Sequence, residues 1–228
     1  MNDRPIALDA MGGDNAPSAT VDGACRALAD GIPVVLVGDE RLIRPRIPAG
    51  LSVDIIHATE AVGMDEAPSA AVRSKKDASV RVAARAVAAG DASAVVSFGS
   101  TGALMAASLM ELGRIDGVER PAVIATLPRS DGGEVVILDL GANVDCKSSH
   151  LAQFGVMGSV FATDVLRLKH PRVGILSNGE EEGKGNEQVR LAMPVLEQMP
   201  IRFVGPVEPS DALQGSCEVV VCDGFVGN

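Results

Sequence analysis

Short apolar runs alternate with helix-length segments along almost the whole 228-residue chain, and this alternation limits the folds that the chain can adopt. The runs are rich in β-branched residues and are continuous, which is typical of parallel strands buried on both faces. Strands that alternate with helices predict an α/β fold with a doubly wound, mostly parallel sheet and right-handed crossovers. The runs lie at residues 6–8, 33–37, 53–56, 94–97, 122–126, 135–138, 173–176, 201–204 and 219–221.

The segments between the runs carry helix signals. Gly90 is a typical C-terminal cap, and Pro200 ends a helical pattern because proline cannot continue one. The two runs between residues 122 and 138 are separated by a short turn with two glycines, which predicts a hairpin. No long linker divides the chain, so we expect a single α/β domain over 1–228 with one sheet. The predicted helices span residues 16–29, 77–89, 148–168 and 186–198.

The composition excludes several classes of function. Aromatic residues make up 2% of the chain, so platforms for stacking nucleic-acid bases are essentially missing. A formal net charge of −10 also opposes binding to a phosphate backbone, and we expect no nucleic-acid partner. The four cysteines show no metal-binding spacing, and a chain of this size needs no disulfides. We therefore expect a reduced, cytoplasmic environment and no metal.

The chemistry of an open α/β sheet is expected at the carboxyl ends of its strands. Five of the predicted strands end in turns rich in Gly, Asn, Asp and Ser, which let backbone amides face a ligand. We expect these turns to meet along one edge of a single sheet. They lie at residues 9–15, 99–103, 139–147, 177–187 and 222–228.

Two of these turns suggest an anion site. Ser100 and Thr101 open a predicted helix, whose first amides attract anions, and Lys184 lies between Gly183 and Gly185. The segment 179–185 lacks the ending of a Walker A loop, and 99–102 is not a dinucleotide fingerprint. A phosphate-sized anion is the ligand that this pattern favours.

The acidic and nucleophilic residues of the turns have simpler interpretations. We expect Asp9, Asp14, Asp139, Asp145 and Asp223 mostly to bind turn amides, with Asp9 and Asp223 as candidates for the site. Residues 180–182 are three glutamates that would repel phosphate if all faced it, so some should face solvent or a basic partner.

A covalent route would need a nucleophile, and Cys146 is the candidate. Its neighbour Asp145 would raise the pKa of the thiol, whereas Lys147 and His150 would lower it, and an inert thiol is the favoured interpretation. His57 and His150 are expected to be surface or turn histidines rather than a catalytic pair.

The densest basic stretch comprises Arg73, Lys75, Lys76, Arg81 and Arg85. It is either a solvated helix face or a docking site for a strongly acidic protein. The sequence leaves these two interpretations equal.

Five separated motifs resemble the bacterial phosphate acyltransferase family (PlsX), in the same order and over the whole chain. They are LDAMGGD at 8–14, TGALMA at 101–106, LDLGANVDC at 138–146, GEEEGKG at 179–185 and CDGFVGN at 222–228. The resemblance implies conversion of acyl-[acyl carrier protein] and inorganic phosphate to acyl phosphate, which leads to acylation of glycerol 3-phosphate in phospholipid synthesis. It also implies a fold similar to phosphotransacetylases and to isocitrate- and isopropylmalate-type dehydrogenases.

The resemblance assigns roles to residues of the motifs. Lys184 and Asn143 are the predicted catalytic residues, with Lys184 and its neighbouring amides holding phosphate. Outside the motifs, Arg73, Lys75 and Lys76 are the residues of the basic stretch that would contact acyl carrier protein if the docking interpretation holds, and we expect no cofactor. Substrate binding is predicted for Asp9, Gly12, Gly13, Ser100, Thr101, Gly102, Gly183, Gly185, Asn186, Asp223, Gly224 and Asn228.

The resemblance also implies partners and a location. Acyl carrier protein, inorganic phosphate and a second copy of the chain are the expected partners, in the cytoplasm or at the inner face of the membrane. A membrane glycerol-3-phosphate acyltransferase is a further partner that the resemblance allows.

The chain departs from the family pattern in two places. The family commonly has Asn where Ser100 stands. Its members also continue beyond the motif at 222–228, so we expect the chain to lack the C-terminal part, which in the family is implicated in membrane association.

Two other functions stay open on the sequence. One is a phosphate acetyl- or butyryltransferase that uses acyl-coenzyme A, which would need a nucleotide pocket that the sequence does not locate. The other is a non-catalytic protein that binds acyl carrier protein in lipid synthesis.

Overall fold

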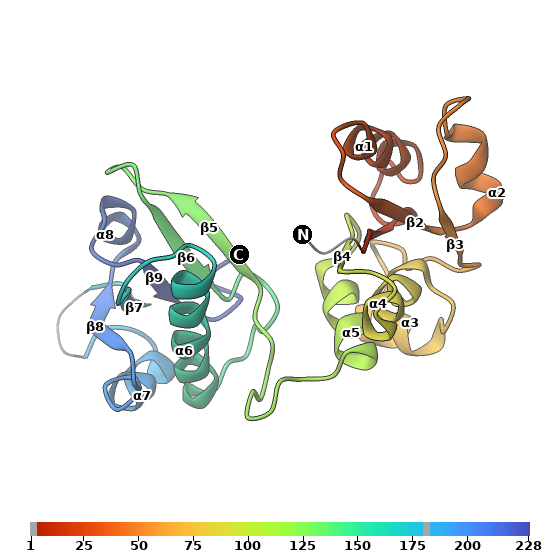
Figure 1. The fold of residues 1–228 in the computed structure, drawn as a ribbon. Coiled ribbons are helices and arrows are strands. Elements are labelled where there is room, and N and C mark those ends of the chain that lie inside the picture. Colours follow the sequence, from red (N-terminus) through yellow and green to blue (C-terminus); the bar gives the residue numbers. More distant parts are fainter. Residues whose placement is uncertain (1–3, 180–182) are drawn as a thin grey trace. The chain divides into compact units, whose positions relative to one another are not determined.

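The computed structural model describes residues 4–179 and 183–228, which form two compact units, Met1–Arg114 and Ile115–Asn228 (Figure 1). Each unit contains its own sheet covered by helices. The fold class is the predicted α/β class with mostly parallel strands. The prediction of one sheet is wrong, since the strands form a four-stranded and a five-stranded sheet. Compactness alone does not decide whether two units act as one domain, so the single domain over 1–228 stays a prediction.

The first unit is built on a fully parallel sheet with the strand order β3-β2-β1-β4. Its strands are β1 (Ile6–Asp9), β2 (Val34–Gly38), β3 (Ile55–His57) and β4 (Ala94–Val96). Its helices are α1 (Ser18–Ala29), α2 (Glu40–Ile43), the 3-10 helix η1 (Arg44–Arg46), α3 (Pro68–Ser74), α4 (Ser79–Ala89) and α5 (Thr101–Glu111).

Successive residues of β1 and β2 point to opposite faces of this sheet, and both faces are covered. Ala7 and Val35 lie in one core cluster with Ala83 of α4. Leu8 and Leu36 lie in a second cluster that includes residues of α1. The continuous apolar runs are therefore explained by burial on both faces, as the sequence predicted.

The second unit has the strand order β5-β6-β9-β7-β8. Strands β5 and β6 form the predicted antiparallel hairpin, and all other neighbours are parallel. The strands are β5 (Ile124–Pro128), β6 (Glu134–Leu138), β7 (Arg172–Leu176), β8 (Arg202–Val207) and β9 (Val219–Val221). The helices are α6 (Ser148–Asp164), α7 (Glu187–Leu196) and α8 (Pro209–Gln214).

Helix α6 approaches the second sheet closely because of its glycines. A Cβ on Gly158 would lie 2.5 Å from a methyl group of Val219 and 2.6 Å from one of Leu138. A Cβ on Gly155 would lie 2.6 Å from Leu196 of α7. Contacts this short do not occur, so both positions require glycine for α6 to pack against the sheet and α7.

Helix boundaries differ from the predicted ones by a few residues. Helix α4 ends at Ala89 and Gly90 follows in the left-handed conformation, as a C-terminal cap requires. Helix α6 stops at Asp164, four residues before the predicted end, and Arg167 then adopts a positive φ of 59°, which breaks the helical path. Among the described residues, no helix is long and apolar enough to cross a membrane.

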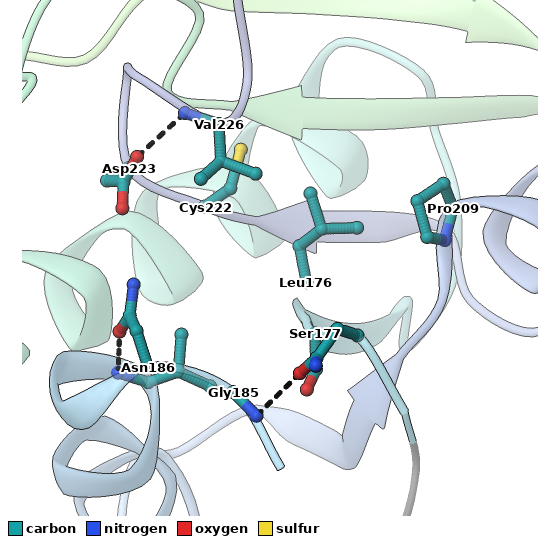
Figure 2. A pocket seen from close by; sticks show the side chains of 10 residues that line it. Leu176, Ser177, Gly185, Asn186, Pro209, Cys222, Asp223 and Val226 are labelled. Carbon is teal, nitrogen blue, oxygen red and sulfur yellow. Dashed lines mark hydrogen bonds between the residues drawn. The ribbon is translucent and has the colours of Figure 1, made fainter.

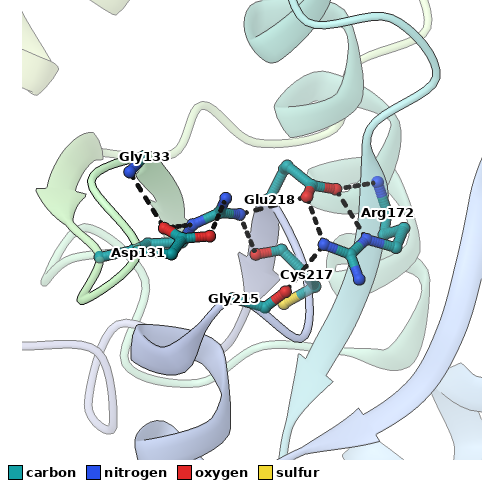
Figure 3. Close-up of polar contacts among 7 residues, drawn as sticks. Asp131, Gly133, Arg172, Gly215, Cys217 and Glu218 are labelled. Atoms are coloured by element: carbon teal, nitrogen blue, oxygen red, sulfur yellow. Dashed lines mark hydrogen bonds and ion pairs between the residues drawn. The ribbon is translucent and has the colours of Figure 1, made fainter.

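A network of charges ties together the amino-terminal side of the second sheet (Figure 3). Glu218, just before β9, pairs with Arg172 of β7 at 2.5 Å and with Arg129, just after β5, at 3.1 Å. Arg129 also pairs with Asp131 at 2.8 Å. Burial raises the pKa of Glu218, but hydrogen bonds from Arg172 and Arg129 outweigh it and lower the pKa to about 2.

We expect Glu218→Gln to lower the free energy of unfolding at pH 7 by about 1–3 kcal/mol, because two arginines lose a shared carboxylate. The folded-state pKa of about 2 lies below the ordinary 4.5, so the carboxylate stabilises the fold above pH 4.5 and this contribution disappears as the pH falls towards 2. Urea denaturation of both proteins at several pH values measures the difference. The exposed Glu134 provides the control, Glu134→Gln. A difference between wild type and Glu218→Gln that is as large at pH 2 as at pH 7 would contradict this explanation.

Candidate functional site

In the first unit, the turns after β1 and β4 meet because these strands are neighbours. The hydroxyl of Ser97 donates to Asp9 Oδ2 at 2.7 Å, and the backbone N–H of Met11 donates to Asp9 Oδ1 at 3.1 Å. Asp9 is buried, so its carboxylate mainly holds the two turns together. Asp9 was one of the two aspartates expected at the site, and its predicted contact with substrate stays a prediction.

Glycines allow these two turns to touch. A Cβ on Gly12 would lie 2.5 Å from Asp9 Oδ2 and 2.9 Å from the Gly99 nitrogen, so no side chain fits there. Gly13 has a positive φ of 100° and lies against the carbonyl of Phe98. These glycines are required by packing, and their predicted contact with substrate stays a prediction.

Helix α5 begins directly after the turn that follows β4. Ser100 is its N-cap, and its hydroxyl oxygen accepts from the Ala103 N–H at 3.4 Å. Thr101 is exposed in the first turn, and a Cβ on Gly102 would lie 3.0 Å from Pro68. The helix N-terminus predicted as an anion site therefore exists, whereas its use by phosphate stays a prediction.

In the second unit, β6, β9, β7 and β8 are parallel, so their carboxyl ends share one edge. The turn after β6 is organised by Asp139, whose side chain is fully buried. Its Oδ1 accepts from the N–H groups of Val123 (2.8 Å) and Ala142 (3.2 Å). Its Oδ2 accepts from the backbone N–H (2.6 Å) and the side-chain Nδ2 (2.8 Å) of Asn143.

The turn after β9 is attached to this loop. The Gly224 N–H donates to the carbonyl of Asn143 at 2.8 Å, and a Cβ on Gly224 would lie 2.9 Å from Asp139 Oδ2. The side chain of Asn228 is close to Gly141, where a Cβ would lie 3.4 Å from its Oδ1. Three residues of the predicted site thus come together with Asp139, but as a packed loop.

Asn143 does not offer its amide to a ligand. Its Nδ2 donates to Asp139 and, at 2.7 Å, to the carbonyl of Pro121, so both hydrogens are used inside the protein. The side chain is buried. The predicted catalytic role of Asn143 is therefore not supported by its surroundings, which give it a structural one.

A cavity of about 570 Å³ lies at the same edge of the second sheet (Figure 2). Its apolar lining comes from Leu176, Val189, Pro209, Cys222 and Val226. Its polar lining comes from Ser177, Asn178, Gly185, Asn186 and Asp223. The cavity therefore contains three residues of the predicted site, namely Gly185, Asn186 and Asp223.

The Lys184 loop leads from β7 into α7. Lys184 and Gly183 are exposed and are not among the residues that line the cavity. The Gly185 N–H already donates to Asn178 Oδ1 at 2.9 Å, so it is not available to phosphate. The expectation for Glu180, Glu181 and Glu182 lies outside the described residues.

The five turns are divided between the two sheets. Those after β1 and β4 belong to the first unit, and those after β6, β7 and β9 belong to the second. The prediction that all five meet on one sheet is therefore wrong. Within each sheet, neighbouring turns do meet, because parallel strands bring their carboxyl ends to one edge.

The thiols of Cys146 and Cys222, at the edge of the second sheet, are protonated at neutral pH. Burial, followed by the charges of Asp139 and Asp223, raises the pKa of Cys146 to about 11. Burial is also the main cause that raises the pKa of Cys222 to about 12. A neutral, buried Cys146, whose Sγ donates to the Asn143 carbonyl at 3.3 Å, supports the inert interpretation.

Asp14, Asp145, His57 and His150 do not line the cavity of the second sheet. Asp14 and Asp145 are exposed, and the described residues contain no group of three or more His, Cys, Asp or Glu able to hold a metal. His57 is exposed and its Nδ1 accepts from the Glu40 N–H at 3.2 Å. His150 is buried instead of at the surface.

The imidazole of His150 fixes the start of α6. Its Nδ1 accepts from the Lys147 N–H, so Nε2 carries the hydrogen and donates to Glu119 at 3.1 Å. This is the role of a turn histidine, and the expectation that His150 takes no part in catalysis stays a prediction.

The basic stretch is partly neutralised. Lys75 pairs with Glu66 at 2.6 Å, and Arg81 and Arg85 pair with Glu111. Arg73 and Lys76 are exposed. Docking of an acidic protein here stays a prediction.

If acyl carrier protein docks on this stretch, Lys76→Glu should raise the Michaelis constant for acyl-[acyl carrier protein], because an attractive charge becomes a repulsive one. Steady-state kinetics with this substrate measure the change, and an unchanged Michaelis constant would contradict docking.

Sequence reasoning missed Ser177 as a site residue, although it directly follows β7. Its side chain is buried and its Oγ has no hydrogen-bond partner among the residues that the structure describes. A serine after a buried strand is too common to be singled out, and only the cavity distinguishes it.

Comparison with known proteins identifies relatives of the chain. A phosphate acyltransferase from Trichlorobacter lovleyi is 50% identical over 98% of this chain and 66% of its own length. One from Bacillus cereus (strain G9842) is 50% identical over 98% of this chain and 68% of its own length. The chain thus spans about two thirds of the length of these relatives.

Solved structures show the same fold. A phosphotransacetylase from Streptococcus pyogenes matches with a TM-score of 0.69 over 99% of this chain and 79% of its own, at 17% identity. A branched-chain phosphotransacylase from Enterococcus faecalis V583 matches with a TM-score of 0.64 over 98% of this chain and 81% of its own, at 16% identity.

The family profile described as "Fatty acid synthesis protein" matches residues 5–228. This match covers both sheets and all five turns described above. The chain belongs to the fatty acid synthesis protein family.

Proposed function

We propose that the chain is part of a phosphate acyltransferase that transfers a fatty acyl group from acyl carrier protein to inorganic phosphate. The observation that carries this proposal is the 50% identity, over 98% of the chain, to proteins named phosphate acyltransferase. Membership of a fatty acid synthesis family supports a fatty acyl substrate.

The reaction needs positioning and charge neutralisation more than new chemical groups. A phosphate oxygen attacks the thioester carbonyl, the new C–O bond forms, the C–S bond breaks, and the thiolate leaves and takes up a proton. Phosphate is a competent nucleophile at neutral pH and a thiol is a good leaving group, so neither a cofactor nor a covalent intermediate is required. The raised pKa of Cys146 agrees with direct transfer.

Lys184 is the proposed phosphate ligand. It is exposed in the loop that leads into α7, whose N-terminus favours negative charge. Gly183 and the other amides of this loop are the proposed further donors, without Gly185. The N-terminus of α5, with Ser100 and Thr101, remains a second proposed anion site.

The partners and location are proposed from the family. Acyl carrier protein is acidic, and the exposed Arg73 and Lys76 are its proposed contacts. Homodimer formation, a cytoplasmic location with peripheral attachment to the membrane, and delivery of acyl phosphate to a membrane glycerol-3-phosphate acyltransferase complete the proposal.

A second candidate is a phosphate acetyl- or butyryltransferase that uses acyl-coenzyme A. The likeness to the phosphotransacetylase and the branched-chain phosphotransacylase favours it, since these proteins share the fold. Their identity of 17% and 16% is far below that of the phosphate acyltransferases, so it remains second.

Trapping with hydroxylamine separates these functions. The protein is mixed with phosphate and either acyl-[acyl carrier protein] or acyl-coenzyme A, and acyl hydroxamate is measured. We expect hydroxamate from the carrier substrate, dependent on phosphate. Product from coenzyme A alone would favour the second candidate, and carrier binding without product would favour a non-catalytic role.

We expect Lys184→Met to lower turnover by about 10²–10³, because one electrostatic contact to the phosphate is lost. The hydroxamate assay measures this change, with phosphate varied to separate binding from turnover. Lys169→Met, at an exposed lysine before β7, is the control and should retain full activity. Unchanged turnover in Lys184→Met would remove the lysine from the site.

A further inference from the structure

The cavity at the edge of the second sheet is built for something larger and less charged than phosphate. Its volume of about 570 Å³ is in the range that holds small organic ligands. Half of its lining residues are apolar, and no lysine or arginine is among the described residues that line it. A phosphate dianion placed here would lose part of its hydration without gaining a cation from these residues, which costs free energy.

Asp223 offers one fixed acceptor to this cavity. Its Oδ1 accepts from the N–H groups of Phe225 at 3.0 Å and Val226 at 2.8 Å, which fixes the orientation of the carboxylate. Its Oδ2 has no hydrogen-bond partner within the described residues. In Figure 2 this second oxygen points away from Val226 and towards Asn186.

Asn186 offers a fixed donor on the opposite side. Its Oδ1 accepts from the Val189 N–H at 2.9 Å and so caps α7. The N-cap role determines which end of the amide is oxygen, because only oxygen can accept this bond. The Nδ2 group therefore faces Asp223 across the cavity, as Figure 2 shows, and no described residue accepts its hydrogens.

A donor and an acceptor that face one cavity match a secondary amide. The amide N–H can donate to Asp223 Oδ2 while its carbonyl accepts from Asn186 Nδ2, and the apolar lining can hold the adjoining methylene groups. The carboxylate of Asp223 would repel an anionic group but not a neutral amide. These features favour a neutral ligand with an amide group and apolar neighbours.

We propose that this cavity binds the amide-bearing arm on which the substrate thioester is carried, with Asp223 and Asn186 as its specificity-determining residues. The inference rests on the proposed function, which requires a thioester donor, and it assigns the donor's arm to a place in the chain. The pantetheine arm common to acyl carrier protein and coenzyme A carries two secondary amides before its sulfur. Lys184, the proposed phosphate ligand, lies directly before Gly185 of the cavity wall, in the loop that leads into α7.

Binding of S-ethyl pantetheine tests the proposal without any reaction, because a thioether cannot transfer an acyl group. Isothermal titration calorimetry should show binding to the wild-type protein and about tenfold weaker binding to Asn186→Ser and to Asp223→Asn, since each loses one hydrogen bond. Serine is as good an N-cap as asparagine, so Asn186→Ser keeps α7 intact. Asparagine at 223 keeps an oxygen for Phe225 and Val226.

The double variant Asn186→Asp/Asp223→Asn is the sharpest test. It exchanges donor and acceptor while preserving the charge and both backbone contacts, so an amide can bind in the reverse direction. Each single change lowers the binding free energy of S-ethyl pantetheine relative to the wild type. We expect the double variant to recover at least half of that loss. Thermal unfolding of each variant verifies that the fold is retained.

Three outcomes would overturn the proposal. They are equal binding to all variants, equal binding of an alkyl thioether of the same length without amides, and displacement of S-ethyl pantetheine by inorganic phosphate alone. Because no turnover is measured, a failure here is distinct from a failure of the proposed function, which the hydroxamate assay reports. If binding of S-ethyl pantetheine differs between the variants but no hydroxamate forms, the proposed arm site is supported and the proposed acyl transfer is contradicted.

Discussion

The buried carboxylate of Asp139 determines how the edge of the second sheet is built. A carboxylate removed from water is tolerated only if its oxygens are hydrogen-bonded, and those of Asp139 receive four N–H groups. These bonds fold the loop after β6 back on itself and place the Asn143 carbonyl where the Gly224 N–H can reach it. The turn after β9, with Asp223 beside the cavity, is therefore positioned by a residue that does not line the cavity.

The first sheet uses the same arrangement on a smaller scale. Asp9 at the end of β1 is buried and joins its own turn to Ser97 after β4. In both units a glycine lies against the aspartate, Gly12 in one and Gly224 in the other, and neither position has room for a Cβ. The glycine-rich motifs thus reflect packing around a buried carboxylate as much as contact with a ligand.

The sequence predicted the type of most elements, because burial on both faces leaves a continuous apolar pattern that local reasoning can detect. The hairpin of β5 and β6 was also predicted, since its turn is local. The division into two sheets was not, because strand order depends on contacts that are distant in sequence. Strand β9, near the end of the chain, lies between β6 and β7, and no periodicity encodes this position.

The site was predicted only in part, because local patterns in the sequence do not show contacts between distant residues. Motifs at strand ends correctly indicated that the turns of neighbouring parallel strands meet, but not how the five turns divide between two sheets or which polar atoms remain available after folding. Asn143 and Gly185 use their N–H groups within the protein, whereas Asn186 and Asp223 each keep one side-chain atom facing the cavity. This distinction needs coordinates, since the residue types are the same in both roles.

Amide hydrogen exchange of Asp139→Asn tests the central role of this carboxylate most directly. An asparagine of the same size retains one acceptor and turns an N–H group towards the donors of the loop, so the bonds to Val123, Ala142 and Asn143 cannot all persist. The account predicts that these three amides and Gly224 lose protection, while β7 and β8 keep theirs. Unchanged protection at Asn143 and Gly224 would contradict it.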